Sequence, residues 1–411
     1  MTVMMLAART APLAAERRAV AAIAFAAVAV FSDMYVTQPL LPALGAEFHV
    51  SPSVAGSTVS AVVFMIALTS SAYGPFADFL GRKRVMAGGC TLLGLATFAC
   101  AFSPNLTALI VLRSLQGAFV PAVSAVAIAY LGDLRRKRDI GGLVGLYIAA
   151  TVTGGMVGRV GSGLIADRWS WHASFVAYGC LTLAAALALA LTLRERRVRA
   201  GRSMLAAFAD SYRAMGRHLG DSREVGAFIA GGTLFFGFIG LFTYLPYLLT
   251  SPPFSLSTGT VAWFYASYAA GVFTAPIAGR LSARISRRLL MSIGFIVALA
   301  GLALTALPSL VAVALGTVVM CVGMFTAQAI VPAYVNVTAT VAKGGANALY
   351  QAFYYVGAVF GSTLPGIGWE RFGWHGVLLT CGASMLLGLV AMLALCREAP
   401  AAAASLRATS R

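Results

Sequence analysis

Three charged residues lie deep within long apolar stretches of this 411-residue chain, namely Asp33, Arg113 and Arg159. An apolar interior favours the neutral form of a carboxyl group, whereas a nearby guanidinium favours the charged form, so a carboxyl between the two can take up and release a proton. Ionisable side chains inside a membrane are costly and usually mark function. We therefore predict that Asp33 is a proton-coupling site tuned by Arg113. A permanent structural ion pair between the two is the alternative.

Other polar and aromatic side chains of the same stretches could contact a substrate. Aromatic rings with a few amides suit flat or amphipathic organic molecules, and Asp33 would favour a cation. Arg159 could line the site and bind an anionic group, or extend to the lipid headgroups. The residues predicted to line the site are Tyr35, Gln38, Gln116, Arg159, Phe236, Tyr244, Tyr268, Gln328, Asn347, Gln351 and Tyr354. The amides are the stronger candidates, because an unpaired amide in lipid is costly.

The elements that must position these side chains are membrane-spanning helices. Hydrophobic residues make up 60% of the chain and charged residues 10%, which excludes a soluble globular protein. A bilayer-crossing helix needs about 20 mostly apolar residues. The apolar runs predict twelve such spans, at 19–44, 53–77, 85–103, 106–132, 139–165, 172–194, 223–250, 259–283, 288–307, 309–337, 343–369 and 374–396. These runs are too long and too uniformly apolar for the strands of a membrane barrel.

The basic residues give the orientation. The chain has 30 Lys and Arg against 13 Asp and Glu, and its basic clusters, such as 82–84 and 135–138, fall in alternate loops. Such loops face the cytoplasm by the positive-inside rule. We expect a multi-pass protein of the cell inner (plasma) membrane with both termini cytoplasmic. We then expect the protein to contact the lipid bilayer and not to bind nucleic acid.

The chain divides into two halves that echo each other. The segment 74–83 matches 279–288, and Trp171-His172 matches Trp374-His375. A repeat of six spans implies two pseudo-symmetric bundles with a binding site at their interface. We predict an N-terminal cytoplasmic tail at 1–18, a six-helix bundle at 19–194, a cytoplasmic linker at 195–222, a second six-helix bundle at 223–396 and a C-terminal tail at 397–411.

The chain resembles the major facilitator superfamily. The resemblance rests on Gly74-x-x-Ala77-Asp78-x-x-Gly81-Arg82-Lys83 between the second and third spans, and on Arg113-Ser-Leu-Gln116-Gly117 in the fourth. The stretches 38–42, 154–159 and 354–357 look most like the acriflavine-sensitivity (YnfM-like) branch of the drug:H⁺ antiporter group. The resemblance implies an all-α membrane protein of 12 transmembrane helices in two six-helix bundles. One departure is Thr153, where the antiporter signature has Pro before its glycine pair.

The resemblance also implies a gating loop formed by Gly74, Asp78, Gly81, Arg82, Lys83 and Asp133. In it, Asp78 would cap a facing helix near 344–347, because a carboxylate stabilises the positive end of a helix. Arg82 would bridge from Asp78 to Asp133. These contacts would hold the outward-facing state.

The function implied is secondary transport. We expect proton-coupled efflux of amphipathic organic compounds or drugs by alternating access, from a monomer whose partners are a small-molecule substrate and protons. Transport of one specific metabolite, a sugar or an organic acid, is the alternative. A membrane-embedded enzyme is a remote alternative. The four histidines, His49, His172, His218 and His375, are scattered along the chain and form no catalytic motif. We expect no enzyme activity, no cofactor and no metal site. The six cysteines show no paired spacing and are expected to be free.

Overall fold

The computed structural model describes residues 2–134, 140–195, 213 and 215–397 of the chain. Within these ranges the chain forms helices and no strands. The basic cluster at 135–138 and most of the predicted linker and C-terminal tail lie outside the described residues. The all-α fold predicted from the sequence is confirmed.

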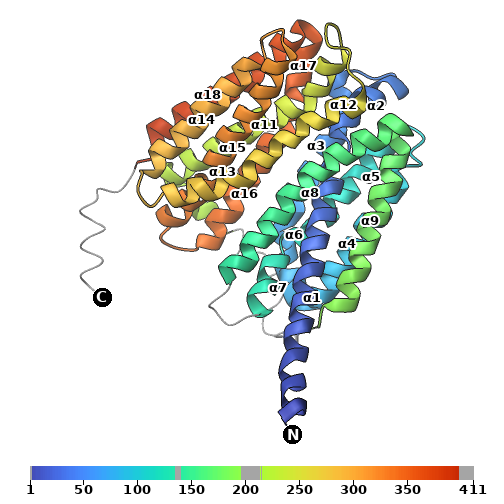
Figure 1. Cartoon of the computed structure of the whole chain (residues 1–411). Coiled ribbons are helices and arrows are strands. Elements are labelled where there is room, and N and C mark those ends of the chain that lie inside the picture. Colours follow the sequence, from blue (N-terminus) through green and yellow to red (C-terminus); the bar gives the residue numbers. More distant parts are fainter. Residues whose placement is uncertain (1, 135–139, 196–212, 214, 398–411) are drawn as a thin grey trace.

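The first half of the chain forms one group of helices, coloured blue to green in Figure 1. Its elements are α1 (Thr2–Tyr35), η1 (Gln38–Leu40), α2 (Leu41–Glu47), α3 (Pro52–Leu80), α4 (Arg82–Cys100), α5 (Leu106–Phe119), α6 (Pro121–Ser124), α7 (Ala127–Leu134), α8 (Ile140–Arg168) and α9 (Trp171–Thr192). Helix α1 packs on α8 and α9, and α4 packs on α9 and α5. We refer to this group as the N-bundle.

The second half forms another group, coloured yellow to red, which we call the C-bundle (Figure 1). Its elements are α11 (Ser222–Thr250), α12 (Thr258–Ala262), η2 (Trp263–Tyr268), α13 (Ala269–Leu281), α14 (Arg287–Leu304), α15 (Leu310–Thr338), α16 (Lys343–Gly361), α17 (Leu364–Phe372) and α18 (Trp374–Leu395). Helix α11 lies against α16 and α18, and α14 lies against α15.

Several predicted spans are interrupted rather than continuous. The spans expected at 19–44, 106–132 and 343–369 each break where a new helical segment starts with a proline among its first two residues, at Pro39, Pro121 and Pro365. Proline lacks the N–H that a helix interior needs and is accommodated at a helix start. The span expected at 259–283 contains the 3-10 segment η2. Side chains beyond each break therefore point in directions that a continuous helix would not give them.

Ten of the described helical segments are long and apolar enough to cross a membrane. The other two predicted spans correspond to α4 and to α16 with α17, and they are helical too. Helix α4 starts with three basic residues, and α16 carries amides and tyrosines, so both are less apolar than the rest. Polar groups in a membrane protein face the interior of the bundle.

Glycines set how closely the helices of each bundle approach one another. A side chain at Gly154 would overlap the backbone of Val28, and one at Gly357 would overlap that of Gly232. These contacts bring α8 against α1 in the N-bundle, and α16 against α11 in the C-bundle. Small residues at such crossings are typical of membrane helices. The pairs fix which face of α1 and of α16 turns inward.

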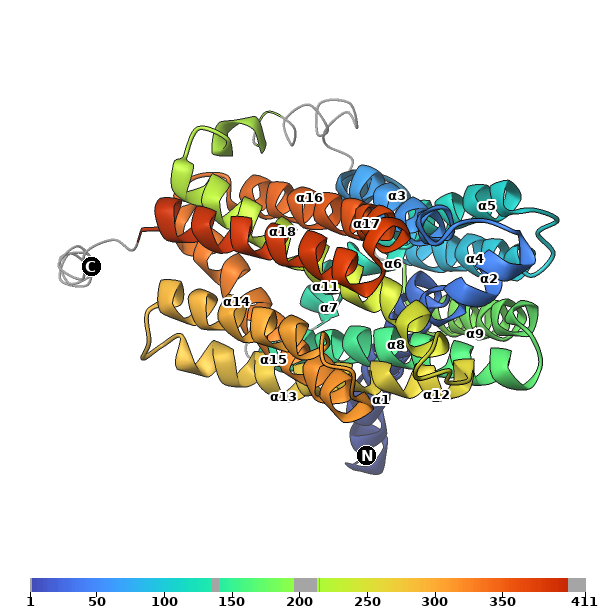
Figure 2. The same ribbon diagram turned by 90° about the horizontal axis from the view of Figure 1, so that it is seen from above.

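The two bundles meet near α2, α3, α12 and α17 and diverge toward the opposite ends of their helices (Figure 1). Seen from above, α3 lies along α16 and α17, and α8 lies along α12 (Figure 2). The region of contact is the end expected to be extracellular. The functional side chains described next lie within the N-bundle, between the bundles, or at the two ends.

Candidate functional site

Arg159 lies between the two bundles with its guanidinium stacked between tyrosine rings. Its Cζ is 3.6 Å from the ring centroid of Tyr35 on α1 and 4.2 Å from that of Tyr268 on η2. Its Nε donates to Oε1 of Gln38 at 2.5 Å, and its Nη1 donates to the Gly155 carbonyl at 2.6 Å. The side chain is fully buried. Extension to the lipid headgroups, one of the two alternatives for Arg159, is therefore contradicted.

The surroundings of Arg159 connect the bundles. Gln38 accepts from Arg159 and donates through Nε2 to Oγ1 of Thr243 on α11, at 3.0 Å. Gln38 occupies this position because α1 ends at Tyr35 and the chain turns into η1. The structure thus brings together four of the predicted substrate-site residues, Tyr35, Gln38, Arg159 and Tyr268. Two polar atoms here, Nη2 of Arg159 and the Tyr268 hydroxyl oxygen, are buried and have no hydrogen-bond partner.

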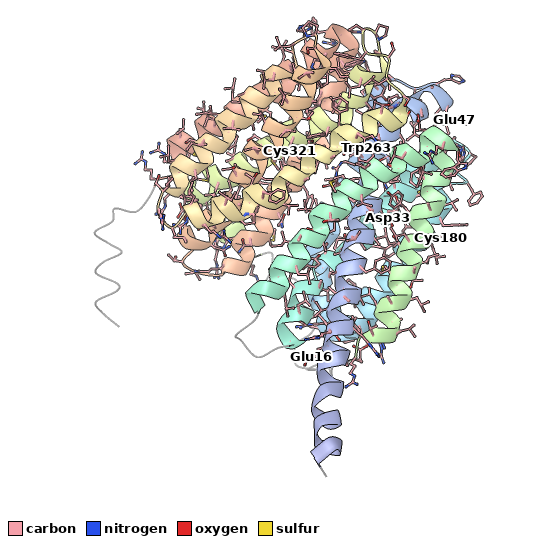
Figure 3. The ribbon with its side chains drawn as sticks, viewed as in Figure 1. Glu16, Asp33, Glu47, Cys180, Trp263 and Cys321 are labelled. Carbon is pink, nitrogen blue, oxygen red and sulfur yellow. The ribbon has the colours of Figure 1, made fainter. Side chains whose placement is uncertain are left out.

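Asp33 lies inside the N-bundle, on the part of α1 that faces α4 and α9 (Figure 3). Its Oδ2 accepts hydrogen bonds from Oγ1 of Thr97, at 3.0 Å, and of Thr182, at 2.7 Å. Its Oδ1 is buried without a partner. The sequence singles out neither threonine, because each helix carries other hydroxyls, such as Thr91 on α4 and Thr192 on α9.

Arg113 does not form an ion pair with the Asp33 carboxylate. Its guanidinium donates to five acceptors: the backbone carbonyls of Asp33, Met34 and Thr58 and the side chains of Thr37 and Gln116, at 2.7 to 3.3 Å. The ion-pair alternative is therefore contradicted. The connection between the two side chains is indirect, since Gln116 donates to Oγ1 of Thr97 at 2.6 Å.

Gln116 lies beside Arg113 in the N-bundle, and the other predicted substrate-site residues lie elsewhere in the C-bundle. Gln328 donates to the Tyr354 hydroxyl at 2.7 Å, and the Tyr354 ring stacks on Phe235 at a centroid distance of 3.7 Å. The Phe235 ring lies 6.3 Å from that of Phe238, which lies 5.1 Å from that of Tyr268, so Tyr354 belongs to the aromatic cluster beside Arg159. The remaining residues are not near Arg159 by any described contact: Phe236 is half-buried, Asn347 pairs with Asn336 at 2.7 Å, Gln351 is exposed, and Tyr244 lies toward the closed end.

The gating loop is partly assembled. Arg82 forms an ion pair with Asp133, lies 3.7 Å from Asp78, and donates to the Ala129 carbonyl at 2.7 Å. The predicted bridge is thus present. Asp78, whose side chain is 73% exposed, makes no described hydrogen bond to α16, so the predicted cap near 344–347 is not formed in this conformation. Lys83 is half-buried beside the loop.

Gly81 has a structural role that the motif alone does not reveal. Its φ of 97° is a conformation that favours glycine, and a side chain there would overlap the carboxylate of Glu195, just past α9. Glu195 also lies 3.7 Å from Arg84. The motif gives no indication of this contact with Glu195. By contrast, a side chain at Gly74 would meet nothing within 4 Å.

The opposite end holds the bundles together through hydrogen bonds. The Ser60 and Ser362 hydroxyls are 2.6 Å apart, Tyr247 donates to the Leu41 carbonyl at 3.0 Å, and the Ser53 hydroxyl donates to Glu370 at 2.5 Å. Hydrogen bonds from Ser53 hold the pKa of Glu370 below its usual value. Tyr244 donates to the Ser362 carbonyl at 2.8 Å, which supports this contact. The structure is closed at this end.

All six cysteines are free, and five are buried. Among the described residues there is no group of three or more His, Cys, Asp or Glu that could hold a metal ion.

Comparison with known families supplies the identity of this fold. The family model of the Major Facilitator Superfamily matches residues 23–261 and 227–410, which together cover most of the chain. The chain belongs to the Major Facilitator Superfamily. The resemblance seen in the 74–83 and 113–117 motifs is confirmed. A member of this superfamily with so many apolar helices is a multi-pass membrane transporter.

Relatives within the Major Facilitator Superfamily cover most of the chain. The uncharacterized transporter YybF of Bacillus subtilis is 28% identical over 85% of this chain and 86% of its own. The inner membrane transport protein YnfM of Escherichia coli is 31% identical over 90% of this chain and 87% of its own. The predicted likeness to YnfM is therefore confirmed. The chloramphenicol resistance protein CraA of Acinetobacter baumannii is 30% identical, over 38% of each chain.

Solved structures share the fold. A D-xylose-proton symporter matches with a TM-score of 0.75, covering 93% of this chain and 98% of its own, at 15% identity. This likeness shows the superfamily fold alone. It agrees with two bundles of helices and an interface between them, where Arg159 lies.

Proposed function

We propose that the protein is a proton-coupled transporter that exports amphipathic organic compounds across the inner membrane by alternating access. The observation that carries this proposal is Asp33. Its carboxyl is fully buried in the N-bundle, lacks a basic partner and accepts hydrogen bonds from two hydroxyls. An ionisable group kept inside a membrane at such cost is typical of proton transfer.

Protonation of Asp33 would change how α1 is held. The charged carboxylate only accepts hydrogen bonds, whereas the neutral carboxyl also donates one. Thr97 and Thr182 hold the carboxyl against α4 and α9. Arg113 grips the same turn of α1 through the carbonyls of Asp33 and Met34. Tyr35 and Gln38, only two and five residues further along, contact Arg159 between the bundles. A proton at Asp33 can thereby alter the substrate site.

Alternating access requires that the two ends of the bundles close in turn. In the proposed orientation, with both termini and the linker at 195–222 cytoplasmic, the hydrogen-bonded end of the bundles is the outer one, and the bundles diverge toward the inner side (Figure 1). Closure of the cytoplasmic end would bring α3 and α16 together there. Asp78 would then reach the start of α16 and complete the gating loop with Arg82 and Asp133.

The names of two relatives support the place of transport and the kind of substrate. The names of YnfM and CraA describe an inner membrane transport protein and a chloramphenicol resistance protein. The alternative is transport of one sugar or organic acid. A panel of drugs applied to an efflux-deficient host expressing the protein separates the two. Resistance to several unrelated compounds supports export of amphipathic compounds, and resistance to none supports the alternative.

Asp33→Asn tests proton coupling directly. The purified variant in liposomes should lose proton movement driven by substrate, because an amide cannot release a proton at neutral pH. The measurement is the fluorescence of a pH dye trapped inside the liposomes. Asp221→Asn is the control, because Asp221 lies at the start of α11 and pairs with Arg223. Proton movement by Asp33→Asn at the wild-type rate would contradict the proposal.

A further inference from the structure

Two hydrogen-bond donors between the bundles have nothing to bind. Nη2 of Arg159 and the hydroxyl of Tyr268 are buried and unpartnered, and they come from opposite bundles. Buried polar groups almost always find a partner, so each orphan in a folded protein needs an explanation. We propose that Arg159 and Tyr268 bind an organic anion, a flat aromatic carboxylate. This inference rests on the proposed transport function and narrows its amphipathic substrates to those that carry a carboxylate.

The hydrogen bonds of Arg159 can be compared with those of Arg113 in the same protein. Both arginines are fully buried in apolar helices, and both lack an ion pair among the described residues. Arg113 uses all three guanidinium nitrogens, with five acceptors of the N-bundle around it. Arg159 uses two nitrogens and leaves the third free. The protein therefore satisfies all three nitrogens of one guanidinium and leaves one nitrogen of the other available.

The charge of Arg159 points to an anion. Removing a charge from water costs several kcal/mol unless a partner of opposite sign is supplied. Asp33, an acid of the same bundle, is held by Thr97 and Thr182 and does not supply that partner. A carboxylate is the best match to a guanidinium, because charge-assisted hydrogen bonds of this kind are short and strong. This proposal differs from the expectation that Asp33 favours a cation.

The neighbouring rings point to a flat aromatic body. The guanidinium covers faces of Tyr35 and Tyr268, and an aromatic cluster continues from Tyr268 through Phe238 and Phe235 to Tyr354. Tyr354 is fixed by its stack on Phe235 and by Gln328. One carboxylate oxygen would accept from Arg159 and the other from Tyr268, while the ring of the ligand rests against Tyr354. Such a ligand holds η2 to α8 and so favours conformations in which the bundles stay close here.

The experiment measures equilibrium binding of radiolabelled naphthoate to the full chain in lipid nanodiscs, with benzoate as a smaller competitor. Naphthamide, which has the same shape and no charge, should compete at least about tenfold more weakly than unlabelled naphthoate. Tyr268→Phe keeps the ring and removes only the unpartnered hydroxyl, and it should weaken naphthoate binding about tenfold. Arg159→Lys should weaken it further, because lysine cannot offer the planar fork of arginine.

Tyr73→Phe is the matched control. Tyr73 also lies in an apolar helix, but its hydroxyl already donates to the Ala118 carbonyl at 2.7 Å. Its variant should bind naphthoate as the wild type does. Equal competition by naphthamide, wild-type affinity of Tyr268→Phe, or no saturable binding of either acid by the wild type would each overturn the anion site. Proton movement that depends on Asp33 would survive such a result, so failure here is distinguishable from failure of the proposed function.

Discussion

At the level of single residues, the N-bundle keeps the Asp33 carboxyl apart from the Arg113 guanidinium. Arg113 reaches from α5 to the turn of α1 that holds Asp33, yet it binds the backbone carbonyl of Asp33 and not its carboxylate. The carboxyl keeps one oxygen without a partner. A carboxyl locked in a strong ion pair would stay charged, whereas one held by two hydroxyls can exchange its proton. The arrangement suits a group that must titrate during a transport cycle.

Arg113→Lys tests whether the guanidinium holds the N-bundle together. Lysine offers one nitrogen in place of three, so several of the five hydrogen bonds should be lost. Each bond between a charged donor and a buried acceptor contributes about 1.5–3 kcal/mol. We expect a clearly lower unfolding temperature in detergent. Arg84→Lys, at a side chain that is 76% exposed, should leave it unchanged. Wild-type stability with lost proton coupling would instead assign Arg113 a direct effect on Asp33.

At the level of elements, helix ends and breaks position the site more than helix faces do. Tyr35 closes α1, Gln38 opens η1, and Tyr268 ends η2. Each of these residues contacts Arg159 or is stacked on it. An uninterrupted helix over 19–44 would direct Gln38 elsewhere. The same holds at the end opposite the closed one, where the turn between α3 and α4 depends on Gly81.

Gly81→Ala should disrupt that turn. The backbone at Gly81 has a φ of 97°, and a side chain would overlap the Glu195 carboxylate. A non-glycine residue in such a conformation costs about 1–3 kcal/mol. We expect a lower unfolding temperature and a lower rate of transport. Gly74→Ala is the matched control, since its side chain would meet nothing. If both variants unfold at the wild-type temperature, the strain argument fails.

At the level of the whole molecule, the hydrogen bonds at the closed end hold one conformation of the two bundles. Ser60 on α3 and Ser362 after α16 lie 2.6 Å apart by their hydroxyl oxygens, and both are buried. Glu370 accepts from Ser53 nearby. Because the pKa of Glu370 is lowered, this contact is present at neutral pH and is lost as the pH falls through that lowered value. The contacts are polar and few, which suits a closure that must reopen.

A disulfide across this closure should stop transport. The double variant Ser60→Cys with Ser362→Cys places two sulfurs within bonding reach, and oxidation should hold the closed end shut. We expect transport in liposomes to fall to background on oxidation and to return on reduction. Ser60→Cys alone should remain active under both conditions. Full activity of the oxidised, cross-linked protein would show that this end does not open during transport.

The sequence determined the helices, their membrane-spanning character and the superfamily, because hydropathy and short motifs are local properties. It also identified Asp33, Arg113 and Arg159 as the charges inside apolar spans, and their depth follows from counting residues along a helix. It could not give the rotation of each helix about its axis. That rotation is set by distant contacts, such as Gly154 against Val28. Only the tertiary structure therefore decided that Asp33 faces two threonines, that Arg113 is satisfied, and that Arg159 is left with a free donor between the bundles.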